Sequence, residues 1–168
     1  MHNLSHTILI SYQTTWADKF EIEKIKLQKV FGNKATAIEH IGSTSIPGLS
    51  AKPIIDIAVL IERREDGDSF IESVERLGYL YDMPKSSGER HFFRKGNPTE
   101  FHLSIAYEDS GGFWKRQILF RDYLRDHSNF RDEYQKLKEK LLQNDPTGQD
   151  TYLDGKSEFV SRVLALAD

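Results

Sequence analysis

The sequence contains no cysteine among its 168 residues, which excludes disulfide bonds, thiol catalysis and cysteine-ligated metal sites. It also lacks an excess of one charge, because 23 Lys and Arg residues stand against 26 Asp and Glu residues. A dedicated nucleic-acid binder usually has a basic excess, so we expect no nucleic-acid partner. A local basic pocket for an anionic substrate remains compatible with this balance, because net charge does not set local fields.

Long apolar runs are missing as well. No stretch approaches the roughly 20 apolar residues that a membrane-spanning helix needs, so we expect no membrane partner. The first residues, MHNLSHTILISYQ, have no basic segment and too short an apolar run for a signal peptide. These features predict a cytoplasmic protein.

The first half of the chain shows a helical period followed by strand patterns. Apolar residues fall on one helix face from Trp16 to Phe31, and Gly32 follows as a stop. TAIEHI then alternates like a strand, and PIIDIAVLI is a continuous aliphatic run, typical of a central strand buried on both faces. A further helix is predicted from Asp68 or Ser69 to Leu77.

The second half predicts a hairpin and then helices. RHFFRKGNPTEFHLSIAY contains two alternating runs around a Gly-Asn-Pro turn, and helical patterns cover 113–126, 129–143 and 149–167. The order of elements predicts an α+β fold, with a mixed β-sheet, flanking helices and a C-terminal helical cap. We expect a single domain over 1–168, with its sheet core over about 34–110 and its C-terminal helices over about 113–167.

One loop combines glycine with three small hydroxyl residues: Gly42, Ser43, Thr44 and Ser45. Such residues favour tight turns for local backbone reasons. They also suit a phosphate-binding loop, because small side chains let backbone N–H groups approach an anion and hydroxyls add donors. The loop is neither a Walker A motif nor a dinucleotide fingerprint. We expect it to open a helical turn that faces a cleft beside Asp56.

Asp56 is a lone acid inside the aliphatic run PIIDIAVLI. A carboxylate in a buried strand is costly unless it is paired or binds a metal. One interpretation is a salt bridge to Lys52, Arg90 or Arg94, or a strand end that already faces solvent. The other is a metal ligand at the edge of a cleft, where Mg²⁺ would carry nucleotide phosphates.

The spacing of these residues resembles the signature of the DNA polymerase beta-like nucleotidyltransferase superfamily. In that signature a Gly-Ser turn precedes a strand with two acids one residue apart, and a later strand supplies a third acid. Gly42-Ser43 matches the turn, and Asp56 matches the first acid. Ala58 stands in place of the second acid, and His102 in place of the third.

The chain is more closely similar to the GrpB family, a nucleotidyltransferase-like group that is also found fused to dephospho-coenzyme A kinase. The similar segments are Tyr12, Trp16, EHIGSTSIPGLSAKPIIDI, LGY at 77–79, His102, Trp114, LFRDYLRDH, Tyr134 with Lys138, and Tyr152 with Lys156. The resemblance implies a palm-like fold with a nucleotide-binding cleft and leaves the reaction undefined.

Further residues are candidates for a metal or for phosphate. His40, Asp56 and His102 would form a two-histidine, one-carboxylate site for a divalent metal such as Mg²⁺ or Mn²⁺, or the histidines are hydrogen-bonded sheet residues. Lys52, Arg90 and Arg94 are candidate phosphate ligands, and the two arginines share one strand face. A solvated edge-strand pair is the alternative for these arginines.

Two repeated pairs on the C-terminal helices have an i, i+4 spacing: Tyr134 with Lys138, and Tyr152 with Lys156. Each pair would stack a base and bind a phosphate, or would be a packed tyrosine under a lysine stem. Arg121 and Asp122 would either form solvated ion pairs or buttress the cleft.

These patterns predict a nucleotidyltransferase-like protein that binds a phosphorylated nucleotide or a related small molecule. Nucleotidyl or phosphoryl transfer would use Asp56 and His102. The alternatives are a catalytically inactive nucleotide-binding module and a metal-dependent hydrolase built on the histidines and Asp56. Ala58 favours the inactive module, because two-metal catalysis relies on a carboxylate cluster.

Overall fold

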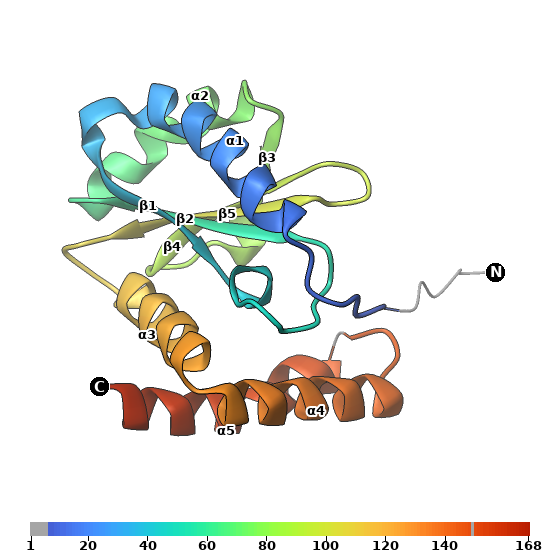
Figure 1. Cartoon of the computed structure of the whole chain (residues 1–168). Coiled ribbons are helices and arrows are strands. Elements are labelled where there is room, and N and C mark those ends of the chain that lie inside the picture. The colour runs from blue at the N-terminus through green and yellow to red at the C-terminus, as the bar shows by residue number, and fades with distance from the viewer. Residues whose placement is uncertain (1–6, 149) are drawn as a thin grey trace.

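A mixed five-stranded sheet lies between two layers of helices in the computed structural model (Figure 1). The backbone is described for residues 7–148 and 150–168, and the side chains for 7–148 and 154–168. The helices are α1 (Thr15–Phe31), α2 (Ile71–Glu75), α3 (Phe113–Asp126), α4 (Ser128–Asn144) and α5 (Asp150–Ala167). The strands are β1 (Ala35–Ile41), β2 (Ile55–Ile61), β3 (Tyr79–Tyr81), β4 (Arg90–Lys95) and β5 (Phe101–Tyr107).

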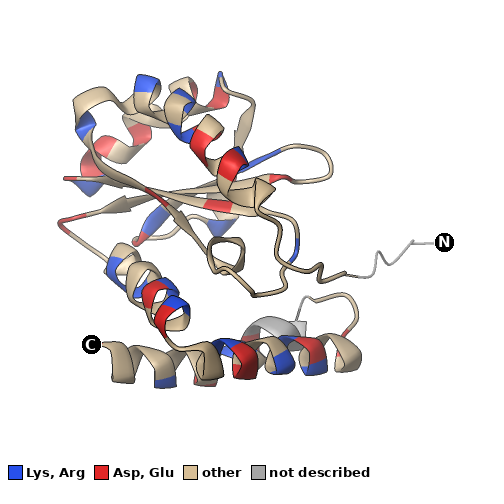
Figure 2. Ribbon diagram, in the orientation of Figure 1, with Lys and Arg blue, Asp and Glu red and all other residues tan. Residues whose placement is uncertain are grey.

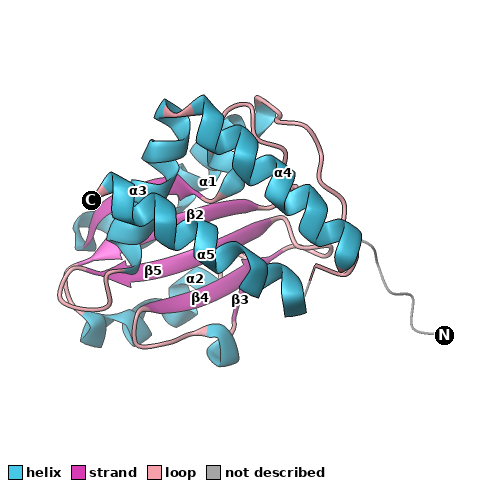
Figure 3. Ribbon diagram, turned by 90° about the horizontal axis from the view of Figure 1, so that it is seen from below, coloured by secondary structure: helices cyan, strands magenta, loops and turns pink. Residues whose placement is uncertain are grey.

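The strand order is β1-β2-β5-β4-β3. Only β2 and β5 pair in parallel among the described strands, and the predicted hairpin of β4 and β5 is confirmed. Helices α1 and α2 cover one face of the sheet, and α3, α4 and α5 lie across the other, as Figure 3 shows from below. The predicted α+β architecture with a C-terminal helical cap is therefore confirmed.

The helix predicted from Asp68 or Ser69 to Leu77 begins earlier and ends earlier. A 3-10 helix spans Arg64–Phe70, and α2 continues only to Glu75. Gly67 lies in the 3-10 segment against the His91 ring, and a Cβ at this position would clash with the ring. Neither predicted cap begins the helix, because the Asp68 carboxylate binds His91 and the Ser69 hydroxyl donates to the Asp66 carbonyl.

The two faces of β2 differ in chemistry. Ile55, Ile57, Val59 and Ile61 point into the main core beneath α1 and are at most 2% exposed. The alternate residues point to the face covered by the C-terminal helices, where Ala58 is fully buried and the Asp56 side chain is 34% exposed. The predicted central strand is thus covered on both faces, and Asp56 lies at the end where the cover is incomplete.

Charges of both signs alternate over the helices. Figure 2 shows acidic and basic residues interspersed along α1, α3 and α4, as expected from the balanced composition. Within the described residues, no helix combines the length and apolar character needed to cross a lipid bilayer.

Candidate functional site

Asp56 and His102 face each other where β2 and β5 begin. They are register partners in the parallel pair, so their side chains share the face covered by the C-terminal helices. His102 Nδ1 lies 3.1 Å from Asp56 Oδ1, and about a third of each side chain is exposed. The partner of the lone acid is therefore a neighbouring histidine at the mouth of a cavity.

The loop after β1 packs directly on the Asp56 carboxylate. Gly42 has a φ of 72°, and a Cβ there would clash with Asp56 Oδ2. Only glycine meets both conditions without strain. The 3-10 turn Ser43–Ser45 follows at once, so the predicted helical turn beside Asp56 is confirmed.

Arginines from the C-terminal helices hold this loop by its backbone carbonyls. Arg121 Nη1 donates to the His40 carbonyl at 2.9 Å and also pairs with Glu39. Arg125 donates through Nε and Nη2 to the Ser45 carbonyl at 2.9 and 2.8 Å, and Arg131 Nη1 donates to the Pro47 carbonyl at 3.2 Å. Charge-assisted hydrogen bonds of this kind are strong, so the loop is fixed before any ligand arrives.

A cavity of about 130 Å³ is lined by Asp56 and by three lysines. Its lining residues are Ser43, Thr44, Ala51, Lys52, Ile54, Asp56, His102, Lys138 and Lys156. Lys138 comes from α4, is 1% exposed, and donates from Nζ to Ser43 Oγ at 3.1 Å and to the Ser50 carbonyl at 2.6 Å. Helices distant in sequence thus bring amines to the glycine-serine loop.

Burial makes these ammonium groups unusually weak bases. Desolvation, followed by repulsion from Lys156 and Lys52, lowers the pKa of Lys138 to about 7. Desolvation and Lys52 lower the pKa of Lys156 to about 8, against an attraction from Asp56. Desolvation lowers the pKa of Lys52 as well, again opposed by Asp56. Three amines with one nearby carboxylate leave a cavity in which a bound anion would stabilise the charged lysines.

A second, larger cavity adjoins the first and shares Ser43, Asp56 and Lys156 with it. It has a volume of about 510 Å³ and extends between α3 and α5. Its further lining residues are Gly42, Arg116, Gln117, Phe120, Tyr134, Ser157, Val160, Ser161 and Leu164. The arrangement joins a small basic chamber to a roomier chamber with aromatic and hydroxyl groups.

The structure assembles part of the predicted site. Gly42, Ser43, Thr44, Lys52, Asp56 and His102 all line these two cavities. The Ser45 hydroxyl instead donates to the Gly42 carbonyl at 2.5 Å. Arg90 donates to Ser104 Oγ at 3.1 Å and lies over the Phe92 ring, whereas Arg94 pairs with Asp82. Both arginines share the predicted face, but neither lines a cavity of the site.

His40 does not join Asp56 and His102. Its register partner is Ile57, so its side chain points to the opposite face, where it stacks on Phe20 at 5.1 Å. His40 Nε2 lies 2.9 Å from Thr44 Oγ1, which donates to the Ile54 carbonyl. Burial lowers the pKa of His40 to about 4, so the ring is neutral.

The predicted metal triad of His40, Asp56 and His102 is therefore not assembled. Within the described part of the chain, no three His, Asp or Glu side chains lie together as metal ligands. His40 is a hydrogen-bonded sheet residue, which was the alternative interpretation.

Ala58 lies where the superfamily signature has its second acid. It is fully buried in a cluster with Ile41, Ala106 and Phe113, the first residue of α3. A carboxylate at this position would be enclosed by apolar side chains at a cost of several kcal/mol. The C-terminal helices therefore pack on this position. The residues present do not fit a two-metal centre.

One of the two interpretations of the Tyr134 and Tyr152 pairs makes Lys138 and Lys156 phosphate ligands, and the structure places both lysines in the wall of the first cavity. The Tyr134 ring stacks on Phe159 at 5.0 Å and lies 5.1 Å from Lys138 Nζ, which is the packed arrangement. The Tyr152 side chain lies outside the described residues. The i, i+4 spacing predicts the shared helix face of each pair, but only the folding of α4 and α5 over the sheet places the lysines at the cavity.

Comparison with known proteins gives the family and the fold. Residues 6–166 match the family model described as GrpB protein. UPF0157 protein BH1888 of Halalkalibacterium halodurans is 35% identical over 167 residues, covering 99% of this chain and 85% of that protein. UPF0157 protein YqkA of Bacillus subtilis is 39% identical over 152 residues, but the match spans only 44% of its length.

Comparison with solved structures supports the same family. The crystal structure of conserved protein GrpB from Enterococcus faecalis matches with a TM-score of 0.85 and 36% identity, over 95% of this chain and 96% of that one. Cid1 poly(U) polymerase bound to Mg 3'-dATP matches with a TM-score of 0.52 and 13% identity, over 77% of this chain and 41% of that one. The second likeness shows the nucleotidyltransferase fold alone. The chain belongs to the GrpB family.

Proposed function

We propose that this protein binds a phosphorylated small molecule, with one phosphate group in the chamber formed by Lys52, Lys138 and Lys156. The observation that carries the proposal is the convergence of these amines with the Ser43 hydroxyl on one cavity of about 130 Å³. Bringing one buried and two partly buried amines together is unfavourable in the free protein, as their lowered pKa values indicate. A phosphate dianion would offset that cost, because opposite charge favours the charged form.

The adjoining chamber suits the remainder of such a ligand. Its volume of about 510 Å³ lies within the roughly 300–1,000 Å³ of small-molecule sites, and it offers the Phe120 ring with the Ser157 and Ser161 hydroxyls. A nucleoside would place its base on apolar surface and its sugar near hydroxyls. We therefore propose a phosphorylated nucleotide or a nucleotide-like coenzyme precursor. Dephospho-CoA kinase of Mycolicibacterium paratuberculosis, 28% identical over 80% of this chain and 39% of its own, makes dephospho-coenzyme A one candidate.

Binding without two-metal catalysis is the function that the residues favour. Lysines surround the phosphate position, and Ala58 is packed under Phe113 where a second acid would stand. The second candidate is nucleotidyl or phosphoryl transfer with a single Mg²⁺ or Mn²⁺, for which Asp56 and His102 are the two available protein ligands. Their side chains are each about one-third exposed at the cavity mouth, which is the observation in its favour.

Thermal-shift measurements test the proposal. ATP, AMP and dephospho-coenzyme A would be added with EDTA, with Mg²⁺ or with Mn²⁺, to wild type, Lys156→Gln and Lys140→Gln. Lys140 is exposed on α4 and serves as the charge-matched control. We expect at least one phosphorylated compound to stabilise wild type and Lys140→Gln in EDTA, by about 2.7 kcal/mol at 100 times its Kd, and to have a much smaller effect on Lys156→Gln. Equal shifts in all three proteins would refute the lysine chamber, and shifts that require the metal would favour the second candidate.

A further inference from the structure

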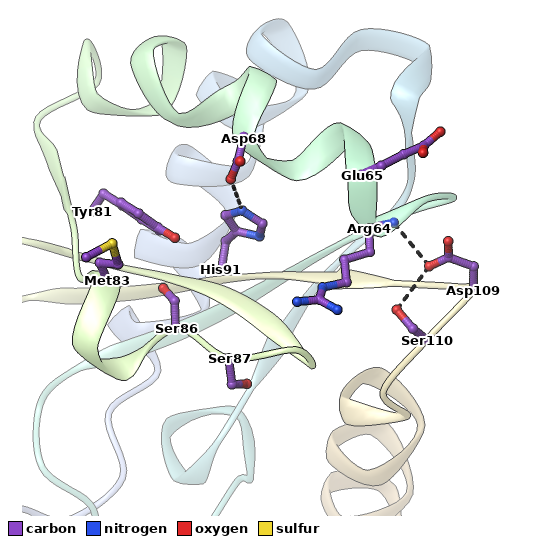
Figure 4. A pocket seen from close by; sticks show the side chains of 10 residues that line it. All are labelled: Arg64, Glu65, Asp68, Tyr81, Met83, Ser86, Ser87, His91, Asp109 and Ser110. Carbon is purple, nitrogen blue, oxygen red and sulfur yellow. Dashed lines mark hydrogen bonds and ion pairs between the residues drawn. The ribbon is translucent and has the colours of Figure 1, made fainter.

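A separate cavity lies at the opposite end of the sheet, where β2 and β5 end and β4 begins (Figure 4). It has a volume of about 630 Å³ and shares no lining residue with the two chambers of the lysine site. Its walls come from the 3-10 segment Arg64–Phe70, the loop between β3 and β4, and Asp109 with Ser110 after β5.

The floor of this cavity is a fixed histidine. His91 is 8% exposed, and its Nε2 lies 2.7 Å from Asp68 Oδ1 while its Nδ1 contacts the Tyr107 hydroxyl. Because a carboxylate only accepts, Nε2 carries the proton, and in the neutral ring Nδ1 then accepts from Tyr107. Burial raises the pKa of Tyr107 to about 12, so its hydroxyl remains a donor. The ring is thus held from both sides and offers a rigid surface.

The carboxylates at this cavity already have partners. Asp68 accepts from His91, and Asp109 Oδ1 accepts from the Arg64 backbone N–H and from Ser110 Oγ, each at 3.1 Å. Glu65 pairs with Arg63 Nη1 at 2.6 Å. The acids therefore serve local structure, and their presence does not define a cation site.

The Arg64 guanidinium differs from these carboxylates. Figure 4 shows the Arg64 side chain projecting into the cavity toward Ser86 and Ser87. Tyr81 and Met83 lie across the cavity from Arg64. Among the described residues it has neither an ion pair nor a side-chain hydrogen bond, although the Arg64 backbone N–H is bonded. A charged fork facing an open polar cavity points to an anionic ligand, because guanidinium binds carboxylate and phosphate through paired hydrogen bonds.

The walls around Arg64 are tied together. A Cβ at Gly111 would lie 2.8 Å from Glu89 Cα, so the two loops are in close contact. Arg116 bridges them by pairing with Glu89 at 2.6 Å and donating to the Gly111 carbonyl at 3.1 Å. The cavity is therefore formed before any ligand binds, which lowers the entropic cost of binding.

We propose that this cavity is a second binding site, for a small molecule that carries a carboxylate or a phosphate group. Arg64 binds the anionic group, and Tyr81 and Met83 contact the carbon skeleton on the other side of the cavity. The volume of about 630 Å³ accommodates a ligand of metabolite size.

The test is a titration of the ¹⁵N-labelled full chain, followed by amide NMR, with inorganic phosphate and with succinate as probes. Wild type, Arg64→Gln and Arg76→Gln are compared. Arg76 is an exposed arginine at the C-terminal end of α2 whose partner is Glu72, so its loss matches the charge change alone.

We expect one of the probes to give saturable shifts at Ser86, Ser87 and Ser110 in wild type and in Arg76→Gln, with at least tenfold weaker binding to Arg64→Gln. Binding of inorganic phosphate would identify the anionic group of the ligand as a phosphate, and binding of succinate would identify it as a carboxylate. Shifts at Ser43 and Lys52 report separately on the lysine site. The proposal is overturned if neither probe shifts the cavity amides, or if Arg64→Gln binds as tightly as wild type.

Discussion

Replacing Lys138 with methionine tests whether burial of the charged Lys138 amine destabilises the folded protein. Lys138 is 1% exposed, and burial lowers its pKa from 10.5 to about 7. Methionine keeps an unbranched stem of similar length and removes the titrating amine. The substitution also removes the hydrogen bonds to Ser43 Oγ and the Ser50 carbonyl, so its effect is read from pH dependence and not from stability at one pH.

The sign follows from the direction of the shift. Between pH 7 and 10.5 the unfolded chain binds more protons at Lys138 than the folded chain does, so this group makes the free energy of unfolding rise with pH. Integrating over pH 7 to 9 gives a gain of about 2 kcal/mol for wild type that Lys138→Met lacks. Below pH 7 Lys138 is protonated in both the folded and the unfolded chain, so the free energies of unfolding of wild type and Lys138→Met should change with pH in parallel.

Urea unfolding at pH 6, 7, 8 and 9 measures this difference, with Lys140→Met as the exposed control on the same helix. We expect the control to follow wild type at every pH. If Lys138→Met also follows wild type from pH 7 to 9, the amine keeps an ordinary pKa and the description of the chamber is wrong.

Two further substitutions test the geometry around Asp56. Gly42→Ala should lower the free energy of unfolding by about 1–3 kcal/mol, because of the positive φ and the clash with Asp56. Gly32 also has a positive φ but has open space around it, so Gly32→Ala should lower the free energy of unfolding by less. Equal urea midpoints for the two variants would contradict the close packing at Gly42. Asp56→Asn at pH 6.5 in EDTA should leave phosphate binding equal or stronger, since it removes a negative charge from the site; calorimetry showing lost binding would instead assign Asp56 to the ligand or to a metal.

The sequence predicts the main chain around the site better than the side chains that meet there. The aliphatic run of β2 and the glycine-serine turn follow from local pattern, so both the central strand and the turn beside Asp56 were predicted. His40 was misplaced because a one-residue difference in register decides the face of a strand. His40 pairs with Ile57, and Ile41 pairs with Asp56.

The basic residues show a second limit. Arg90 and Arg94 have the expected spacing and share a face, yet Ser104 and Asp82 bind them. Lys138 reaches Ser43 across 95 residues of sequence, and only the packing of α4 and α5 over the sheet brings them together. Helix period gives the face of such a lysine but not the partner it meets.

Proton uptake during phosphate binding tests the central claim most directly. A phosphate monoester such as AMP is a dianion at pH 8, since its second pKa is about 6. At that pH Lys138 is mainly neutral and Lys156 is about half protonated, given their pKa values of about 7 and about 8. Calorimetric titration of wild type with AMP in EDTA, in two buffers of different ionisation enthalpy, should show uptake of about one proton per ligand. Binding without proton uptake, or no saturable binding, would contradict a lysine chamber built for phosphate.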